Sequence, residues 1–188
     1  MERINPQMSK SEGKTVLTPP VDEGTVRALA TGEEVLVSGV IHTARDMAHA
    51  RLASLDAEEV PFPLRGGAIY HCGPIVLRKG GSWEVVAAGP TTSSRTERYI
   101  PPILERHSPR IFIGKGGLGE AALEAFERFG CVYLSAVGGC AQSLANAVTA
   151  VRNVFYLDEF GVPEAVWELE VENFPAIVTM DARGNSMH

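Results

Sequence analysis

Apolar residues recur along the chain in short runs that are bounded by glycine, proline and polar residues. Short runs that are rich in valine and isoleucine are typical of buried strands. The densest run covers residues 35–41, and we expect further strands at 15–18, 68–72, 83–88, 111–113, 132–135, 151–157, 165–171 and 176–180. The pattern also predicts that 83–88 is buried, that 73–81 is a connection, and that 158–161 and 172–175 are turns.

The segments between these runs carry helical signals. We expect helices at 22–30, 47–55, 98–106 and 120–129, and a helix of small residues that ends near residue 147. Asp22 is a good N-cap for the first of these helices, and Gly130 stops the helix over 120–129. Thr43 and Asp46 could cap the helix over 47–55. Strands and helices in this order predict an α/β fold with a mixed central sheet flanked by helices.

Length and composition restrict the class of protein. A chain of 188 residues can form one domain with a sizeable core, and we expect a flexible N-terminal arm over 1–14 and one domain over 15–188. No apolar window reaches the length of a membrane span, and the polar arm lacks the core of a signal peptide, so we expect a cytoplasmic protein. The net charge of −6 is spread along the chain, which argues against a nucleic-acid partner.

The chain has three cysteines, Cys72, Cys131 and Cys140, with no Cys-x-x-Cys pair. An odd number without such spacing makes a disulfide framework a poor interpretation. Three thiolates could hold an iron–sulfur cluster with one open iron. However, Cys72 ends one apolar run and Cys131 begins another, where cysteine usually acts as a small buried apolar residue. We therefore expect no metal bound by this chain alone.

The segment 89–95, Gly-Pro-Thr-Thr-Ser-Ser-Arg, carries four hydroxyls and a guanidinium at the end of a predicted strand. Glycine and proline force a sharp exit from the strand. The hydroxyls of Thr91, Thr92 and Ser93 and nearby backbone N–H groups could then converge on an anion, with Arg95 beside them. The alternative is that these residues only cap the following helix.

Two other strand ends also carry a cation. Arg45 precedes a predicted helix, where a cation opposes the helix dipole, so it either needs an anion or lies solvated on the surface. Lys115 lies in a glycine-rich loop between Gly114 and Gly116, although the order of residues is not that of a phosphate-binding loop.

Ligand sites in α/β sheets gather outside the carboxyl ends of strands. Three cations and several hydroxyls at such ends suit a ligand with two carboxylates, since arginine binds carboxylate bidentately and lysine binds it as a point charge. These segments contain no strong base other than Asp46.

Five segments, taken in order, resemble a known family. They are Ser-Gly-Val-Ile-His-Thr-Ala-Arg-Asp-Met-Ala-His (38–49), Gly-Pro-Thr-Thr-Ser-Ser-Arg (89–95), Ile-Gly-Lys-Gly (113–116), Ala-Val-Gly-Gly (136–139) and Glu-Val-Glu-Asn-Phe-Pro-Ala (170–176). Together they resemble the C-terminal part of class I fumarases and the β subunit of L-tartrate dehydratase. The departures are modest, and include Ser93-Ser94 where the family often has one serine and a bulkier residue.

The resemblance implies a swivelling β/β/α domain that works with a larger α subunit, in an α2β2 assembly. It implies that the partner holds an oxygen-sensitive four-iron four-sulfur cluster, because the cysteines of this chain do not match the family's cluster motif. It also implies that Arg45, Arg95 and Lys115 bind the dicarboxylate substrate and that Thr91 transfers a proton at the substrate carbon.

The function implied is therefore that of a hydro-lyase of the fumarate hydratase class I type, active only with its α partner. The first expectation is the interconversion of fumarate and L-malate, a step of the tricarboxylic acid cycle. Dehydration of tartrate stays open as an alternative, and so does a domain that binds anions without catalysis.

Overall fold

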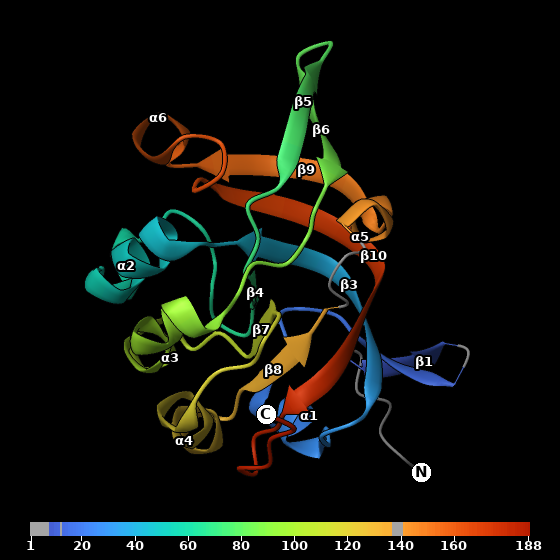
Figure 1. Ribbon diagram of the computed structural model, residues 1–188, viewed down its shortest axis with the longest axis vertical. Coiled ribbons are helices and arrows are strands. Elements are labelled where there is room, and N and C mark those ends of the chain that lie inside the picture. The colour runs from blue at the N-terminus through green and yellow to red at the C-terminus, as the bar shows by residue number, and fades with distance from the viewer. Residues whose placement is uncertain (1–7, 12, 137–140) are drawn as a thin grey trace.

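Figure 1 shows the computed structural model of the chain, which describes residues 8–11, 13–136 and 141–188. The strands of the main sheet are β1 (Met8–Ser11), β2 (Lys14–Leu17), β3 (Glu34–Thr43), β4 (Ala68–Tyr70), β7 (Ile111–Gly114), β8 (Val132–Ser135), β9 (Val148–Phe155) and β10 (Val166–Met180). Strands β5 (Ile75–Lys79) and β6 (Ser82–Ala87) form a separate hairpin. The helices are α1 (Glu23–Ala28), α2 (Asp46–Ser54), α3 (Ile100–His107), α4 (Glu120–Phe129), α5 (Ala141–Asn146) and α6 (Leu157–Phe160), with 3-10 turns η1 (Ala57–Glu59) and η2 (Ser94–Tyr99).

The main sheet is mixed, as expected. Strands β2, β3, β4, β7 and β8 run parallel to one another, whereas β1 is antiparallel to β2, and β10 is antiparallel to β3, β8 and β9. Because β3 pairs with both β4 and β10, the strands β3, β4, β7, β8 and β10 close into a ring. The parallel strands β3, β4 and β7 therefore present their carboxyl ends at one shared edge.

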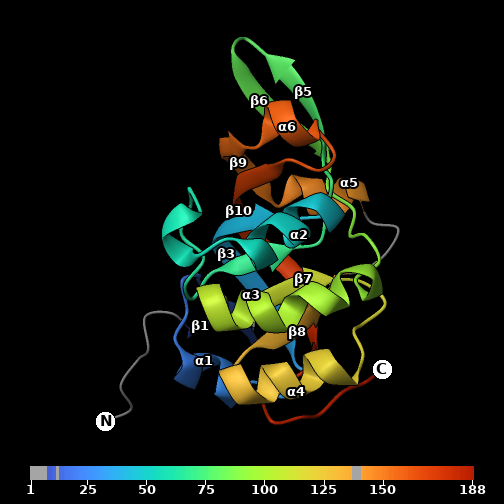
Figure 2. The same ribbon diagram turned by 90° about the vertical axis from the view of Figure 1, so that its left-hand side faces the viewer.

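Both faces of the parallel strands are buried, which explains their continuous apolar runs. Ile111 and Ile113 point into one core, whereas Phe112, between them, points into the other. Helices α2, α3 and α4 stack side by side over the second face (Figures 1 and 2). Successive side chains of a strand point to opposite faces of the sheet, so alternate residues pack into the two cores on its two sides.

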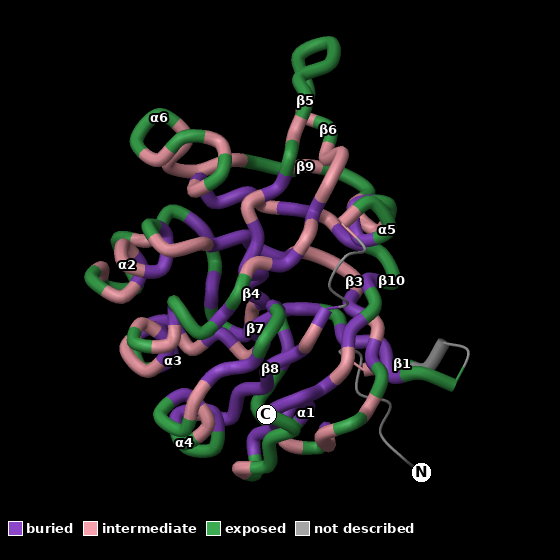
Figure 3. Tube along the Cα trace, in the orientation of Figure 1, coloured by how far each residue is buried: buried purple, intermediate pink, exposed green. Residues whose placement is uncertain are grey.

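The hairpin of β5 and β6 corrects two expectations. Residues 73–81 were expected to be a connection, but they contain β5, because Gly80 and Gly81 both adopt positive φ and form a two-residue turn. Strand β6 was expected to be buried, but it pairs only with β5 and its residues are partly or fully exposed. The hairpin projects from the rest of the molecule, and its tip is exposed (Figure 3). Trp83, two residues after the turn, packs against Trp167, with ring centroids 5.3 Å apart.

Strand β10 corrects a third expectation, since the runs 165–171 and 176–180 belong to one strand. The expected turn at 172–175 is a bulge, where the pairing with β3 shifts between Val171 and Phe174. Asn173 adopts a left-handed φ of 52°, and its N–H donates to the Ser38 hydroxyl at 2.9 Å. Pairing with β3 on both sides of the bulge keeps the strand continuous.

The remaining differences are local. Residues 8–11 of the expected arm form β1, which pairs with β2, while 1–7 and 12 lie outside the described residues. A helical turn, α6, replaces the expected turn at 158–161. Residues 137–140, which include Cys140 and part of one motif, also lie outside the described residues. Among the helices of the described segments, none is long and apolar enough to cross a membrane.

Candidate functional site

The shared edge brings together the three segments that carry the predicted site residues. Thr91 donates its N–H to the carbonyl of His71, just after β4, at 2.7 Å. Ser93 donates its N–H to the carbonyl of Lys115, just after β7, at 3.0 Å, and Thr92 pairs with Lys115 as a parallel β-bridge. Segment 89–95 thus lies across the ends of β4 and β7. We call Arg45, Thr91, Arg95 and Lys115, with their supporting loops, the strand-end site.

Arg45 has the anion that its place before a helix requires. Its Nε lies 3.3 Å from a carboxylate oxygen of Glu164, and both side chains are largely buried. The other oxygen of Glu164 accepts the N–H of Met47 at 2.9 Å, so Glu164 caps α2. The expected caps are wrong: Thr43 accepts the N–H of Trp167 at 2.9 Å and does not cap α2. Asp46, the first residue of α2, makes an ion pair with Arg95 and is not the cap either.

Asp46 pairs with Arg95, with an oxygen–nitrogen distance of 3.1 Å. Both side chains are about half exposed, at 41% and 52%. Two carboxylates therefore balance two of the three predicted cations. Lys115 is exposed and has no ion-pair partner among residues 8–11, 13–136 and 141–188. A ligand with two carboxylates must consequently compete with Asp46 and Glu164 for the two arginines.

The hydroxyls of segment 89–95 do not all face the same way. Thr91 is partly exposed and donates its hydroxyl to the His71 carbonyl at 3.2 Å, which leaves its oxygen lone pairs available. Thr92 is exposed beside Lys115. Ser93 is fully buried and directly precedes η2, but its side chain makes no capping bond, so it neither faces a ligand nor acts as the plain cap that was the alternative.

Beneath the site runs a chain of buried hydrogen bonds that the sequence motifs did not predict. His49 Nδ1 lies 2.9 Å from the Arg45 carbonyl oxygen, and its Nε2 lies 3.1 Å from His71 Nε2. His71 Nδ1 lies 2.7 Å from the Ser93 hydroxyl, which lies 2.8 Å from the hydroxyl of Tyr133. Burial lowers the pKa of His49 to about 4 and holds the pKa of His71 well below its usual value. We call His49, His71, Ser93 and Tyr133 the buried chain.

Two glycines of the Gly-Lys-Gly loop serve different needs. A Cβ on Gly114 would overlap the Ser93 hydroxyl and lie 2.8 Å from the Tyr133 hydroxyl, so only glycine leaves room for the buried chain. Gly116 adopts a φ of +76°, which a residue with a side chain rarely adopts. Packing and backbone conformation therefore account for both glycines, and their supporting role toward an anion stays a prediction.

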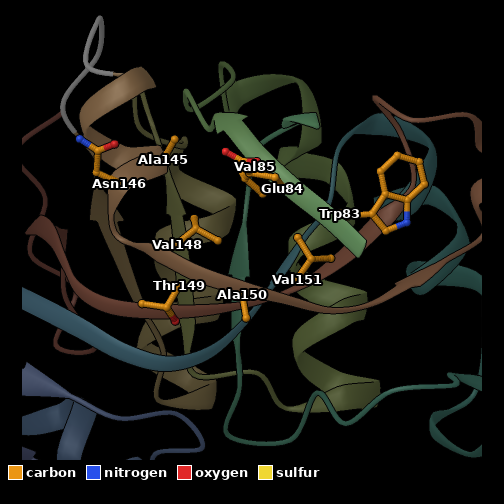
Figure 4. A pocket seen from close by; sticks show the side chains of 9 residues that line it. All are labelled: Trp83, Glu84, Val85, Ala145, Asn146, Val148, Thr149, Ala150 and Val151. Atoms are coloured by element: carbon orange, nitrogen blue, oxygen red, sulfur yellow. The ribbon is translucent and has the colours of Figure 1, made fainter. Parts of the chain in front are cut away.

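The hollows of the surface only partly coincide with this site. A hollow of about 260 Å³ lies between β6, α5 and β9, and its lining contains none of the predicted site residues (Figure 4). Arg95 lines a second, open hollow of about 410 Å³ together with Ser94, Glu97, Arg98 and Ala121. Of the predicted cations, Arg95, in η2, therefore lines one of these hollows.

Comparison with known proteins decides the family. The family model for the fumarase C-terminus matches residues 2–188. This chain belongs to the fumarase C-terminus family. A protein from Geobacillus stearothermophilus named putative fumarate hydratase class I is 47% identical over 173 residues, which is 92% of this chain and 33% of that protein.

Two other relatives of this fumarase C-terminus chain carry a different name. A putative L(+)-tartrate dehydratase subunit beta from Methanocaldococcus jannaschii is 46% identical over 87% of this chain and 85% of its own length. The L(+)-tartrate dehydratase subunit beta of Escherichia coli is 35% identical over 93% of this chain and 86% of its own length. The chain therefore spans a third of the fumarate hydratase relative and most of the tartrate dehydratase relatives.

The described thiols of this fumarase C-terminus chain do not suit metal binding. Cys72 and Cys131 are buried and free, and burial raises the pKa of both, that of Cys72 to about 12. A thiol must lose its proton to bind iron. Within the described residues, no group of three or more histidine, cysteine or acidic side chains is placed to hold a metal ion. An iron–sulfur cluster therefore does not fit these residues.

Proposed function

We propose that this chain is the β subunit, or the equivalent C-terminal part, of a class I hydro-lyase. The reaction would add or remove water across the double bond of a four-carbon dicarboxylate, with fumarate and L-malate as the first candidates. The observation that carries the proposal is the meeting of segments 45–46, 89–95 and 114–116 at one edge, through the ion pair of Asp46 with Arg95 and the bond of Ser93 to Lys115. The name of the Geobacillus relative supports this choice of substrate.

In this proposal Arg45, Arg95 and Lys115 bind the two carboxylates of the substrate. Arginine suits a carboxylate because its planar donors bind both oxygens, and the unpaired ammonium of Lys115 adds a positive charge that no carboxylate of the described residues balances. The two arginines are held in place before the ligand arrives by Glu164 and Asp46.

Thr91 would move the proton at the substrate carbon. A threonine hydroxyl is a weak base at neutral pH, so it needs positive charge nearby to stabilise its deprotonated form. Lys115 can supply this charge, because it forms a β-bridge with Thr92, the residue next to Thr91. The His71 carbonyl accepts a hydrogen bond from the Thr91 hydroxyl and so orients the hydroxyl oxygen of Thr91.

We further propose that a partner α subunit holds the iron–sulfur cluster, which would act as a Lewis acid toward the departing hydroxyl. The pair would assemble as α2β2 in the cytoplasm, and the chain would behave as a swivelling domain against its partner. The relatives named as subunit beta support a partner of this kind.

Dehydration of L(+)-tartrate is a second candidate. It is favoured by relatives that carry that name and that match this chain over 85% and 86% of their own length. A domain that only binds anions is the third candidate, and it predicts binding without turnover.

The proposal is tested by adding this chain to a cluster-loaded α subunit and assaying fumarate and L(+)-tartrate separately. The chain alone should be inactive, and the mixture should hydrate fumarate. Turnover of tartrate alone would replace the first candidate by the second. Binding of a dicarboxylate without turnover of either substrate would favour the third.

Thr91→Val should lower kcat by about 100-fold or more, because loss of a proton-transfer group typically costs 10²–10⁴-fold. Thr91→Ser is the matched control, since it keeps the hydroxyl, and it should retain most of the activity. Full turnover by the Val variant in the active mixture would remove Thr91 from proton transfer.

A further inference from the structure

The buried chain can carry its hydrogen bonds in only one direction. The Arg45 carbonyl can only accept, so His49 Nδ1 must carry a proton and donate it. In a neutral imidazole the other nitrogen then accepts, so His71 Nε2 carries the proton shared across the 3.1 Å contact. His71 Nδ1 consequently accepts from the hydroxyl of Ser93, which in turn accepts from the hydroxyl of Tyr133.

The proton arrangement is set at the Arg45 end of the buried chain. The Arg45 carbonyl cannot donate, so it fixes the proton on His49 Nδ1, and each following contact then has one assigned donor. Burial raises the pKa of Tyr133 to about 12, so its hydroxyl keeps the proton that it donates to Ser93.

Each link of the buried chain is tied to a different loop of the strand-end site. His49 is fixed to the backbone of Arg45, and Ser93 lies between Thr91 and Arg95 in the sequence. The Lys115 carbonyl accepts the N–H of Ser93 at 3.0 Å, which joins the Gly-Lys-Gly loop to the buried chain. The His71 backbone carbonyl also accepts both the N–H and the hydroxyl of Thr91. Breaking one link thus loosens at least two loops relative to each other.

We propose that His49, His71, Ser93 and Tyr133 form a one-way hydrogen-bond chain that positions the loops of Arg45, Thr91 and Lys115 relative to one another, with His71 as the central positioning residue. The link to catalysis rests on the proposed function. The positioning itself is a property of this chain, and it can be measured without any enzyme assay.

The first test is nuclear magnetic resonance of the full chain with 15N-labelled histidine, which reports the protonated nitrogen of each ring. At pH 7 we expect His49 to be neutral with its proton on Nδ1, and His71 to be neutral with its proton on Nε2. A proton on the opposite nitrogen of either ring, or on both nitrogens, would overturn the proposal.

The second test compares Ser93→Ala with Thr15→Val. Ser93→Ala leaves His71 Nδ1 and the Tyr133 hydroxyl without partners, and amide hydrogen exchange at Thr91 and Lys115 should become about tenfold faster or more. Thr15→Val is the control, because it removes another buried hydroxyl, bonded to Glu33 at 2.6 Å in the amino-terminal half of the sheet. It should leave exchange at both sites unchanged.

The third test uses the active mixture with the α subunit. Ser93→Ala should lower kcat by about 10- to 100-fold with a smaller change in KM, because Thr91 is displaced with His71 while Glu164 and Asp46 still pair with the two arginines. His49→Gln should retain activity, because the amide offers one donor toward Arg45 and one acceptor toward His71. His49→Leu, which offers neither, should behave like Ser93→Ala.

These readouts separate the two proposals. If the unaltered mixture turns over no dicarboxylate, the proposed function fails, and the exchange rates at Thr91 and Lys115 still decide the positioning role. If Ser93→Ala leaves those rates at the unaltered value, the positioning role is wrong even in an active enzyme.

Discussion

Arg95 meets a carboxylate before any ligand arrives, since Asp46 lies 3.1 Å from it. A pair that is about half exposed contributes little to stability, because water screens both charges. In the proposed site its value is different, because the carboxylate would hold the guanidinium at the strand ends until a substrate carboxylate replaced it. Arg45 has a similar arrangement with Glu164, although that pair is more buried.

Arg95→Ala should weaken transition-state binding by about 2 kcal/mol or more if the partner subunit covers the site, because a buried carboxylate would lose its charged partner. Steady-state kinetics of the reconstituted enzyme measure this as a fall in kcat/KM. Arg95→Lys keeps the charge but not the planar donors, so its kcat/KM should lie between those of the unaltered enzyme and of Arg95→Ala. Unchanged kinetics in Arg95→Ala would exclude this residue from substrate binding.

Gly114 is fixed by the atoms around it rather than by its own conformation. Gly114→Ala should destabilise the chain by about 1–3 kcal/mol, because the new methyl group overlaps the Ser93 hydroxyl in a packed interior. Urea unfolding measures the change. Gly24→Ala is the matched control, since its Cβ would meet nothing closer than 3.4 Å and alanine favours a helix. Equal stability of the two variants would contradict this packing argument.

At the scale of elements, helix α2 depends on a residue from another part of the chain. Its N-cap, Arg45, makes no side-chain capping bond, and the cap comes instead from Glu164, 117 residues after Met47 in the sequence. The same carboxylate faces Arg45. Glu164 thus links the connection before β10 to the helix that follows β3, and it keeps the two side by side.

Glu164→Ala should destabilise the chain by about 1 kcal/mol, the usual cost of a lost helix cap. The rate of amide hydrogen exchange in the first turn of α2 should increase in the same variant. Glu164→Gln separates the two roles, because its amide oxygen still accepts from Met47 while the charge facing Arg45 is gone. We expect it to keep most of the stability, and a loss as large as that of the Ala variant would assign the effect to charge.

At the scale of the whole molecule, three histidines are buried in a neutral form. Burial lowers the pKa of His42 and His49 to about 4, and it holds the pKa of His71 well below its usual value. Asp46 faces His49 and partly opposes the shift, and Glu168 lies 3.8 Å from His42. The folded chain therefore binds fewer protons than the unfolded chain at mildly acidic pH.

Stability should consequently fall as the pH decreases from about 6.5 toward 4, because protons then favour the unfolded state. At pH 5 a histidine whose pKa is lowered to about 4 should contribute a loss on the order of 2 kcal/mol. Urea unfolding at pH 7, 6 and 5 measures the slope, and His49→Gln should make it shallower. A free energy of unfolding that is constant from pH 7 to 5 would contradict the neutral burial of these rings.

The sequence alone determined the elements whose signals are local. Each apolar run of the parallel strands predicted a strand, and Gly130 and Asp22 marked helix ends that the structure confirms. Local signals work there because a strand that is buried on both faces must be apolar throughout, and because caps act on adjacent residues. The same signals failed for β5, whose residues are mostly exposed, and for β10, where a bulge resembles a turn.

Only the tertiary structure decided how these elements serve the site. The sequence indicated that Arg45 needs an anion, but Glu164 becomes that anion because the ring of strands brings the start of β10 beside the end of β3. Likewise, Ser93 looked like a ligand or a cap, and it became an internal link because His71, just after β4, and Tyr133, on β8, lie on either side of β7 within reach of its hydroxyl. A chain encodes its strands and caps through near neighbours, whereas charge pairs and buried polar chains depend on which distant segments the topology places in contact.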